Sequence, residues 1–108
     1  MTPEAAAETA ALIADLWQRH LPTLRERLDI LDRIALSASK STISKEDREE
    51  AIAISHKFAG SLGMYGYSHG TEIASQLEQL FRSDPPMQPD LITPLTIELR
   101  QSIFPDDK

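Results

Sequence analysis

The sequence predicts an all-α protein, an antiparallel four-helix bundle with an additional terminal helix. Residues that favour helix, chiefly Ala, Leu, Ile, Glu and Arg, fill long stretches, whereas Val is absent and there are only 4 glycines. Apolar residues recur at steps of three and four within these stretches, which gives each helix one apolar stripe. Short polar or proline-containing segments separate the stripes, so we expect consecutive helices to run in opposite directions.

Length and composition narrow the class of protein. The 108 residues have room for one core, so we expect a single domain over residues 1–108. A formal net charge of −6 and the lack of a basic stripe argue against nucleic-acid binding, and the absence of cysteine excludes disulfides and thiolate chemistry. The N-terminus lacks signal-peptide features, and no apolar run approaches the roughly 20 residues of a membrane span. We expect a monomeric cytoplasmic protein without membrane contact.

The first helical segment is expected to begin with Thr2 as N-cap and Pro3 at its first position. Pro22 leaves two alternatives, because it either opens a second helix or kinks one long helix. Residues 36–42 are polar and serine-rich and are expected to form a loop. Apolar residues with helical spacing lie on both sides of the proline: Leu12, Ile13, Leu16, Trp17, Leu24, Leu28, Leu31, Ile34 and Ala35.

A variant capping box predicts the next helix start, with Ser44 as N-cap and Asp47 three residues later. Acidic residues in the first turn suit the positive end of the helix dipole. This helix is expected to run to about Leu62, after which glycines between residues 60 and 70 loosen or turn the chain. Its apolar face consists of Ala51, Ile54, Phe58 and Leu62.

Two further helices complete the prediction. Ser68 is expected to cap a helix that residues 83–86 stop. The last helix begins either near Thr93, with Pro94 in its first turn, or near Pro89 with a bend. In the helix that Ser68 starts, the residues expected to face inward are Ile73, Leu77, Leu80 and Phe81. In the last helix they are Leu91, Leu95, Leu99 and Ile103.

His56 lies midway along the helix expected at 44–62 and points away from the apolar stripe. At about 100° per residue, its imidazole is roughly 200° from Phe58 around the helix axis. Because glycine within a helix costs about 0.5–1 kcal/mol relative to alanine, Gly60 indicates that another molecule approaches here. The neighbours expected to contact such a partner are Ile52, Ala53, Ala59, Gly60 and Gly63. All of them except Ile52 are small.

An exposed histidine is largely neutral at cytoplasmic pH, and a neutral ring nitrogen is a nucleophile toward phosphorus. Lys57 can swing its ammonium group toward a phosphoryl oxygen, and Ser61 can supply a hydroxyl. No carboxylate is obviously placed as a general base, and there is no Gly-rich phosphate loop or Walker lysine. The chain is therefore expected to receive phosphate from a partner that brings its own metal. The alternative is an ordinary exposed histidine on a structural helical domain.

The residues around His56 resemble the signature of histidine-containing phosphotransfer (Hpt) domains. In that family an apolar residue follows the histidine by two positions, lysine usually by three, glycine by four, and a second glycine by ten. Phe58, Gly60 and Gly66 fit this pattern. The resemblance covers about residues 10–82 and includes a Leu-Pro helix at residues 21–28 and an Ala-x-x-Leu-Glu stretch at Ala74, Leu77 and Glu78.

The resemblance implies a bundle that carries phosphate on His56 between aspartates of receiver domains in a two-component phosphorelay. It implies response-regulator receivers or a hybrid histidine kinase as partners, with magnesium held by the receiver and no cofactor on this chain. Lys57 matches the basic residue that some members place directly after the histidine, and Gly60 leaves room for the receiver. Ala59 stands where many members have lysine, so stabilisation of the phosphoryl charge is expected to depend on Lys57 with Ser61.

Two other functions are compatible with the sequence: an adaptor that binds receivers without phosphorylation, and a phosphoacceptor module for a separate histidine kinase. The presence of His56 and Gly60 argues against the adaptor, and Ala59 argues weakly for it. In both phosphotransfer interpretations the chain carries a phosphohistidine and is not an independent enzyme. His20 and His69 lack ligand spacing with His56, so no metal site is expected.

Overall fold

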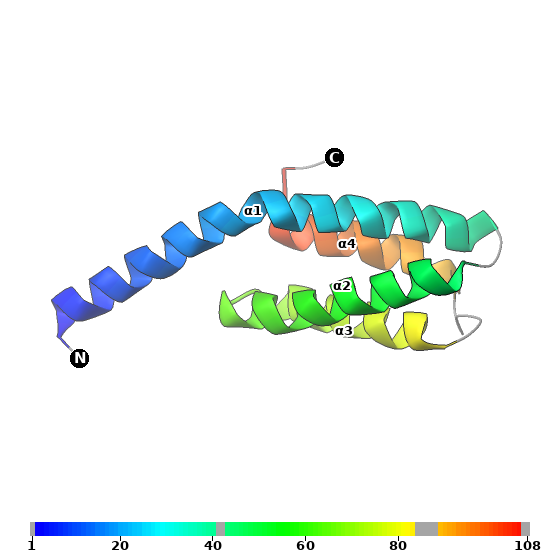
Figure 1. Ribbon diagram of the computed structural model, residues 1–108. Helices are drawn as coiled ribbons and strands as arrows, with labels where there is room; N and C mark the ends of the chain where they lie inside the picture. Colours follow the sequence, from blue (N-terminus) through cyan, green and yellow to red (C-terminus); the bar gives the residue numbers. More distant parts are fainter. Residues whose placement is uncertain (1, 41–42, 84–88, 107–108) are drawn as a thin grey trace.

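The computed structural model of the protein describes residues 2–40, 43–83 and 89–106, which form four α-helices, one 3₁₀ turn and no strand. The helices are α1 (Pro3–Lys40), α2 (Lys45–Met64), α3 (Ser68–Arg82) and α4 (Ile92–Ile103), and the 3₁₀ turn η1 (Pro89–Leu91) directly precedes α4. Figure 1 shows that consecutive helices run in opposite directions. The prediction of an all-α antiparallel bundle is confirmed.

Pro3–Lys40 forms one long helix, which settles the alternatives at Pro22. Thr2 caps its start, because the Thr2 hydroxyl oxygen accepts a hydrogen bond from the Ala5 N–H at 3.1 Å. Proline removes one backbone donor and crowds the preceding turn, and Figure 1 shows the axis of α1 bending where the helix leaves the bundle. The additional terminal helix expected from the sequence is therefore the N-terminal half of α1 and not a separate element.

The loop expected at residues 36–42 was wrong, because α1 continues to Lys40. The serines of this stretch satisfy their hydroxyls within the helix. Ser37 donates to the carbonyl oxygen of Arg33 at 3.3 Å, and Ser39 donates to that of Leu36 at 2.8 Å. Serine hydroxyls can bond to carbonyls of the preceding turn, so a serine-rich composition does not end a helix by itself. Residues 41–42 lie outside the described residues.

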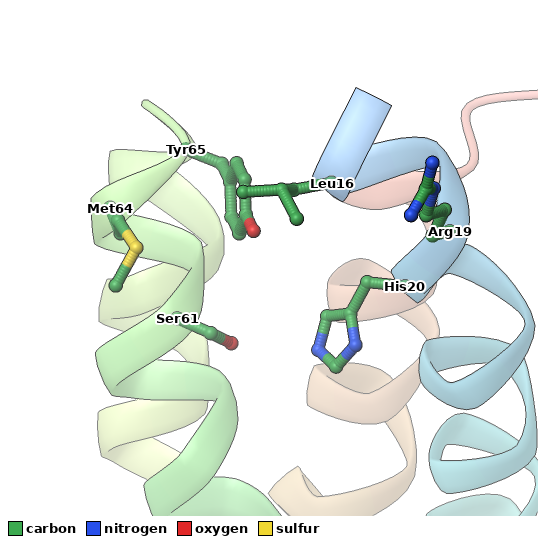
Figure 2. A pocket seen from close by; sticks show the side chains of 6 residues that line it. All are labelled: Leu16, Arg19, His20, Ser61, Met64 and Tyr65. Atoms are coloured by element: carbon green, nitrogen blue, oxygen red, sulfur yellow. The ribbon is translucent and has the colours of Figure 1, made fainter. Parts of the chain in front are cut away.

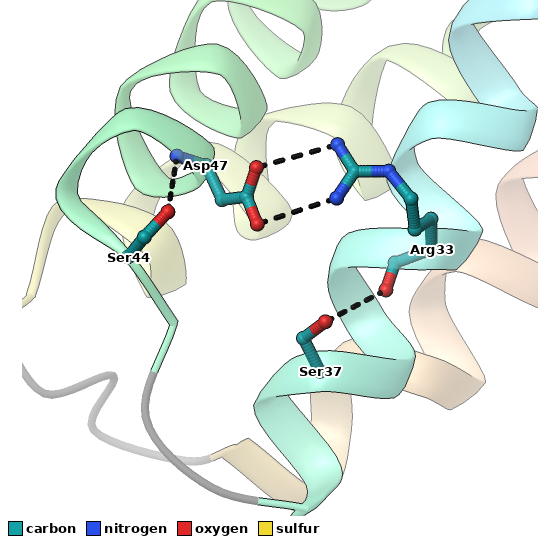
Figure 3. Close-up of polar contacts among 4 residues, drawn as sticks. All are labelled: Arg33, Ser37, Ser44 and Asp47. Carbon is teal, nitrogen blue, oxygen red and sulfur yellow. Dashed lines mark hydrogen bonds and ion pairs between the residues drawn. The ribbon is translucent and has the colours of Figure 1, made fainter.

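The start of α2 agrees with the predicted cap. The Ser44 hydroxyl oxygen accepts a hydrogen bond from the Asp47 N–H at 3.0 Å. The Asp47 carboxylate binds the guanidinium of Arg33 on α1, with both oxygens 3.3 Å from a nitrogen (Figure 3). Asp47, the acid of the expected capping box, therefore connects α2 to α1.

The starts of α3 and α4 differ in detail from the predictions. Ser68 is the first residue of α3 and not its cap, because Tyr67 occupies the N-cap position without a side-chain hydrogen bond. α4 begins at Ile92 with Pro94 in its first turn, close to the first of the two alternatives. Leu91, expected to face inward, is 43% exposed, and Ile92 is buried in its place. The stop expected at residues 83–86 lies mainly outside the described residues.

The core lies between the four helices, and most of the predicted stripe residues reach it. A large apolar side chain that is fully buried contributes roughly 1.5–3 kcal/mol relative to exposure. α3 packs so closely that a Cβ at Gly70 would lie 2.9 Å from Leu62 Cδ1 and 3.0 Å from Ser102 Oγ. The largest fully buried apolar side chains are Phe58, Phe81, Leu24, Leu28, Leu31, Ile34, Leu62, Ile73, Leu77, Ile92 and Leu99.

Candidate functional site

His56 lies on the outer face of α2, near the middle of the helix. Its side chain is 72% exposed, whereas Phe58, two residues later, is buried in the core. Residues two apart on a helix point in nearly opposite directions, so burial of Phe58 turns the imidazole toward solvent. The outward orientation expected from the spacing is confirmed.

Glu78 of α3 is the residue that contacts the His56 ring. Its Oε1 lies 3.1 Å from His56 Nδ1, and only 15% of the Glu78 side chain is exposed. From the sequence, Glu78 is recognisable only as part of the Ala-x-x-Leu-Glu stretch and no carboxylate is obviously placed as a general base, whereas the structure brings Glu78 into contact with the imidazole. The sequence signal that could have indicated this contact is the position of Glu78 next to Leu77, at the edge of the apolar face of α3.

Arg82, one turn further along α3, binds the other carboxylate oxygen of Glu78. Arg82 Nε donates to Oε2 at 3.0 Å, and Arg82 Nη2 donates to the same oxygen. The hydrogen bond from Arg82 is the main cause that lowers the pKa of Glu78; partial burial opposes it, and the hydrogen bond to His56 adds to the lowering. Glu78 is therefore ionised at neutral pH.

The charge on Glu78 favours one tautomer of a neutral His56 ring. An ionised carboxylate only accepts hydrogen bonds, so the neutral imidazole beside it carries its proton on Nδ1. The lone pair of the neutral ring then lies on Nε2. Because the side chain is largely exposed, Nε2 is accessible to another molecule. The three residues form a chain from Arg82 through Glu78 to His56 that leaves Nε2 of the ring at the surface.

The glycines near His56 differ in what they accommodate. Apart from the adjoining backbone of α2, a Cβ at Gly60 would meet no atom of the described residues within 4 Å, so packing among them does not require glycine there. A Cβ at Gly63 would lie 3.3 Å from Thr71 Oγ1, so Gly63 allows α2 and α3 to approach. Ala53 is exposed and Ile52 half-buried, while Ala59 is half-buried against the core. The open surface beside His56 thus centres on Gly60.

The structure does not bring Ser61 to His56. The two side chains differ by about 140° around α2, and Ser61 Oγ is buried with no hydrogen-bond partner among the described residues. Figure 2 shows Ser61 directed into a cleft of about 320 Å³ between α1 and α2, where His20 points in from the other side. Lys57 is exposed on α2 next to His56 in sequence. The cleft is lined by Leu16, Arg19, His20, Ser61, Met64 and Tyr65.

Within residues 2–40, 43–83 and 89–106, no three His, Asp or Glu side chains converge in a way that could hold a metal ion. None of the helices in these ranges is long and apolar enough to cross a membrane.

Comparison with protein families adds to this geometry. The sequence profile of the Hpt domain matches residues 15–103, which is most of the chain. The chain belongs to the Hpt domain family. Membership implies histidine phosphotransfer in a two-component phosphorelay, in agreement with the exposed imidazole of His56.

This Hpt domain is also similar to a part of a much longer protein. It is 28% identical over 96 residues to Protein RcaC of Microchaete diplosiphon, a match that covers 86% of this chain and 15% of that protein. The Hpt domain thus spans only a small share of the length of this relative. No solved structure matches the chain.

Proposed function

We propose that this Hpt domain is a phosphorelay intermediate that accepts a phosphoryl group on His56 from one receiver domain and donates it to another. The contact of His56 Nδ1 with Glu78 Oε1 carries the proposal, because it leaves Nε2 as the nucleophile at an exposed position. The domain acts in the cytoplasm as a carrier and not as an independent enzyme. Response-regulator receivers, or a hybrid histidine kinase that contains one, are its partners.

The transfer is an in-line displacement at phosphorus. The lone pair of His56 Nε2 forms a bond to the phosphorus of an aspartyl phosphate, and the bond from phosphorus to the aspartyl oxygen breaks. The aspartate leaves as a carboxylate, and the imidazole ring gains positive charge because it retains its Nδ1 proton. The negative charge of Glu78 stabilises this cation, and the same steps in reverse load the second receiver.

Charge on the phosphoryl group is offset from both sides of the interface. Magnesium on the receiver neutralises part of it, and Lys57 supplies a cation from this chain. Ala59 leaves the usual lysine position without charge, and its half-buried place against the core explains why an alanine packs well there. Arg82 acts through Glu78, whose carboxylate it already binds. Ser61 does not belong to this set, because its hydroxyl lies in the cleft between α1 and α2.

Docking depends on the open surface around Gly60. The receiver must bring its aspartyl phosphate within bonding distance of Nε2, which requires close approach of two backbones. Gly60 and Ala53 leave space for that approach, and the partly exposed Ile52 adds apolar contact. Ala59 and Gly63 contact the receiver at the edge of this surface, where it borders the core and α3.

The test is phosphotransfer from a phosphorylated receiver domain to the purified protein, followed by intact mass. We expect acid-labile phosphate on the wild type and none on His56→Gln. The matched control is His69→Gln, because His69 is also exposed and its Nε2 lies 2.9 Å from Glu98 Oε1. His69→Gln should accept phosphate like the wild type.

The other outcomes separate the alternative functions. If receivers bind but none of a panel transfers phosphate, the chain is an adaptor. If phosphate arrives only from a kinase domain with ATP and never from a receiver, the chain is a phosphoacceptor module of that kinase. Phosphate that persists on His56→Gln and disappears from His69→Gln would contradict the assignment of the site.

A further inference from the structure

Met64 is the last residue of α2 and, at 76%, the most exposed large apolar side chain in the part of the chain that the structure describes. The other large apolar residues of α2 differ from it, because Ile54, Phe58 and Leu62 are buried and Ile52 is half-buried. Single exposed apolar side chains are common on protein surfaces. Whether Met64 has a function therefore depends on where it lies relative to His56.

Met64 lies on the same side of α2 as His56. At 100° and 1.5 Å per residue, the step of eight residues places Met64 about 80° around the helix axis from His56 and about 12 Å along it. Ser61 is turned further from His56 and points across the cleft toward His20 in Figure 2, whereas Met64 does not. Met64 also lines this cleft. It therefore lies where the outer face of α2 borders the cleft.

The surface between His56 and Met64 is low, because Gly60 and Gly63 are exposed and carry no side chain. A partner that rests on Gly60 while it reaches Nε2 of His56 meets Met64 as the next large apolar side chain toward the end of α2. In the opposite direction, two turns before His56, the same face carries the exposed carboxylate of Glu49. The two ends of this face are thus chemically different.

The size of protein interfaces brings Met64 under a partner that is bound at His56. A standard interface covers about 800 Å² on each partner, which corresponds to a disc of about 16 Å radius. Met64 lies within that distance of His56. Methionine is enriched at interfaces, and its flexible thioether adapts to different surfaces. This property suits a carrier that presents one face both to the receiver that loads it and to the receiver that it loads.

We infer that Met64 is a docking contact for receiver domains and packs against an apolar side chain of the receiver, about 12 Å from the receiver's phosphorylated aspartate. The inference rests on the proposed phosphotransfer by His56 and adds the direction in which the receiver extends, toward the end of α2 and away from Glu49. Met64 is too far along the helix to touch the phosphoryl group. The contact therefore determines affinity for the receiver and not the chemistry at Nε2.

The first test measures the rate of phosphotransfer to the domain as a function of the concentration of phosphorylated receiver. We expect Met64→Lys and Met64→Glu each to raise the half-saturating concentration by about fivefold or more. The maximal rate should stay within about twofold of the wild type, because the reacting groups are unchanged. Met64→Leu keeps an apolar side chain and should behave like the wild type.

The controls of this test address charge and folding. Loss of affinity with both signs of charge indicates an apolar contact, whereas a purely electrostatic effect reverses with the sign. Ile97→Lys is the matched control, because Ile97 is 51% exposed on α4, which packs against α1 and α3. It should transfer phosphate like the wild type. Thermal unfolding of each variant shows that the bundle is intact.

A second test locates the receiver without phosphotransfer. The chain has no cysteine, so a single introduced cysteine carries a short photo-crosslinker at one defined position. In the His56→Gln background, the label on Met64→Cys should cross-link to a receiver strongly, the label on Glu49→Cys weakly, and the label on Ile97→Cys not at all.

The outcomes separate this inference from the proposed function. If the wild type accepts phosphate but both charged variants at residue 64 show its half-saturating concentration, the inference is wrong and the proposed function stands. Stronger cross-linking from residue 49 than from residue 64 would also overturn it. A reduced maximal rate with unchanged half-saturation would place Met64 in the chemistry and contradict a docking role. A wild type that neither accepts phosphate nor cross-links to any receiver would instead refute the proposed function, and the inference with it.

Discussion

The two halves of α1 both carry apolar residues at helical spacing but lie in different surroundings. In the half within the bundle, Leu24, Leu28 and Leu31 are fully buried against the other helices. In the N-terminal half, residues 3–20, which we call the overhang, Leu12 and Leu16 also lie four residues apart but are 59% and 46% exposed. The helix itself is continuous through both halves.

This difference shows that periodicity defines the face of a helix but not what covers it. A stripe at helical spacing predicts which side chains share a direction. Burial depends on whether another element lies opposite. α2 ends at Met64, so this chain meets the overhang mainly near its end, where Trp17 packs on Tyr65 and Tyr67 (Figure 1). The overhang is therefore expected to respond to mutation differently from the bundle, and the following predictions test that contrast.

The largest effect is expected in the core half of α1. Leu28→Ala removes a fully buried side chain and should lower the free energy of unfolding by about 2–5 kcal/mol. Leu12→Ala, the same change in the overhang, should alter it by less than about 0.5 kcal/mol in dilute protein. Urea denaturation at low protein concentration measures both values. Equal losses would contradict the view that the overhang contributes little to the bundle.

A similar contrast separates two glycines. Gly70→Val should lower the free energy of unfolding by about 1–3 kcal/mol, because its first side-chain atom already meets Leu62 and Ser102. Gly60→Val enters open space and should leave stability within about 0.5 kcal/mol. We expect Gly60→Val to slow phosphotransfer by obstructing the receiver. Thermal unfolding and transfer assays on both variants distinguish these effects, and rapid transfer by Gly60→Val would contradict the assigned role.

Two helix caps provide a third comparison. Ser44→Ala removes the cap of α2 and should lower the free energy of unfolding by about 1 kcal/mol. Thr2→Ala removes the equivalent hydrogen bond at the start of the overhang. Because the overhang can fray without opening the bundle, the global unfolding transition should not change. Hydrogen exchange of the first turns should nevertheless become faster. A global loss at Thr2→Ala as large as at Ser44→Ala would contradict this expectation.

The smallest expected effect is the pH dependence of the stabilisation that Glu78 provides. The folded state lowers the pKa of Glu78 below its ordinary value of 4.5, mainly through the hydrogen bond from Arg82. The resulting stabilisation is therefore present above the ordinary value and is lost as pH falls through the folded pKa. We expect the difference in urea midpoint between wild type and Glu78→Gln to be constant near neutral pH and to shrink in acid. A difference that persists at low pH would contradict an ionic origin.

Much of the fold could be predicted because local signals agree with the tertiary structure. The Thr2 and Ser44 caps act as expected, and the stripe of α2 is buried at Ala51, Ile54 and Phe58. The predicted loop at residues 36–42 was wrong because Ser37 and Ser39 bond to helix carbonyls, an arrangement that composition does not reveal. Ser68 was a wrong cap because the turn with Gly66 at φ 87° starts α3 without a side-chain bond.

The candidate site was predicted in part. His56 and its open neighbour Gly60 follow from spacing on a single helix, where 100° per residue fixes relative direction. The contact with Glu78 joins residues 22 positions apart, and the role of Arg82 depends on that contact. Neither follows from one helix alone, because the rotation of α3 relative to α2 is set by the packing of their buried faces.

The sequence by itself determined most of the helical segments and the outward direction of His56, since each depends only on residues within one helix. The tertiary structure decided which carboxylate contacts the imidazole, that Ser61 lies in a cleft away from it, and where the cover over α1 ends. The physical reason is the range of the interactions. Helical geometry is fixed over one or two turns, whereas these contacts depend on how separate helices pack against one another.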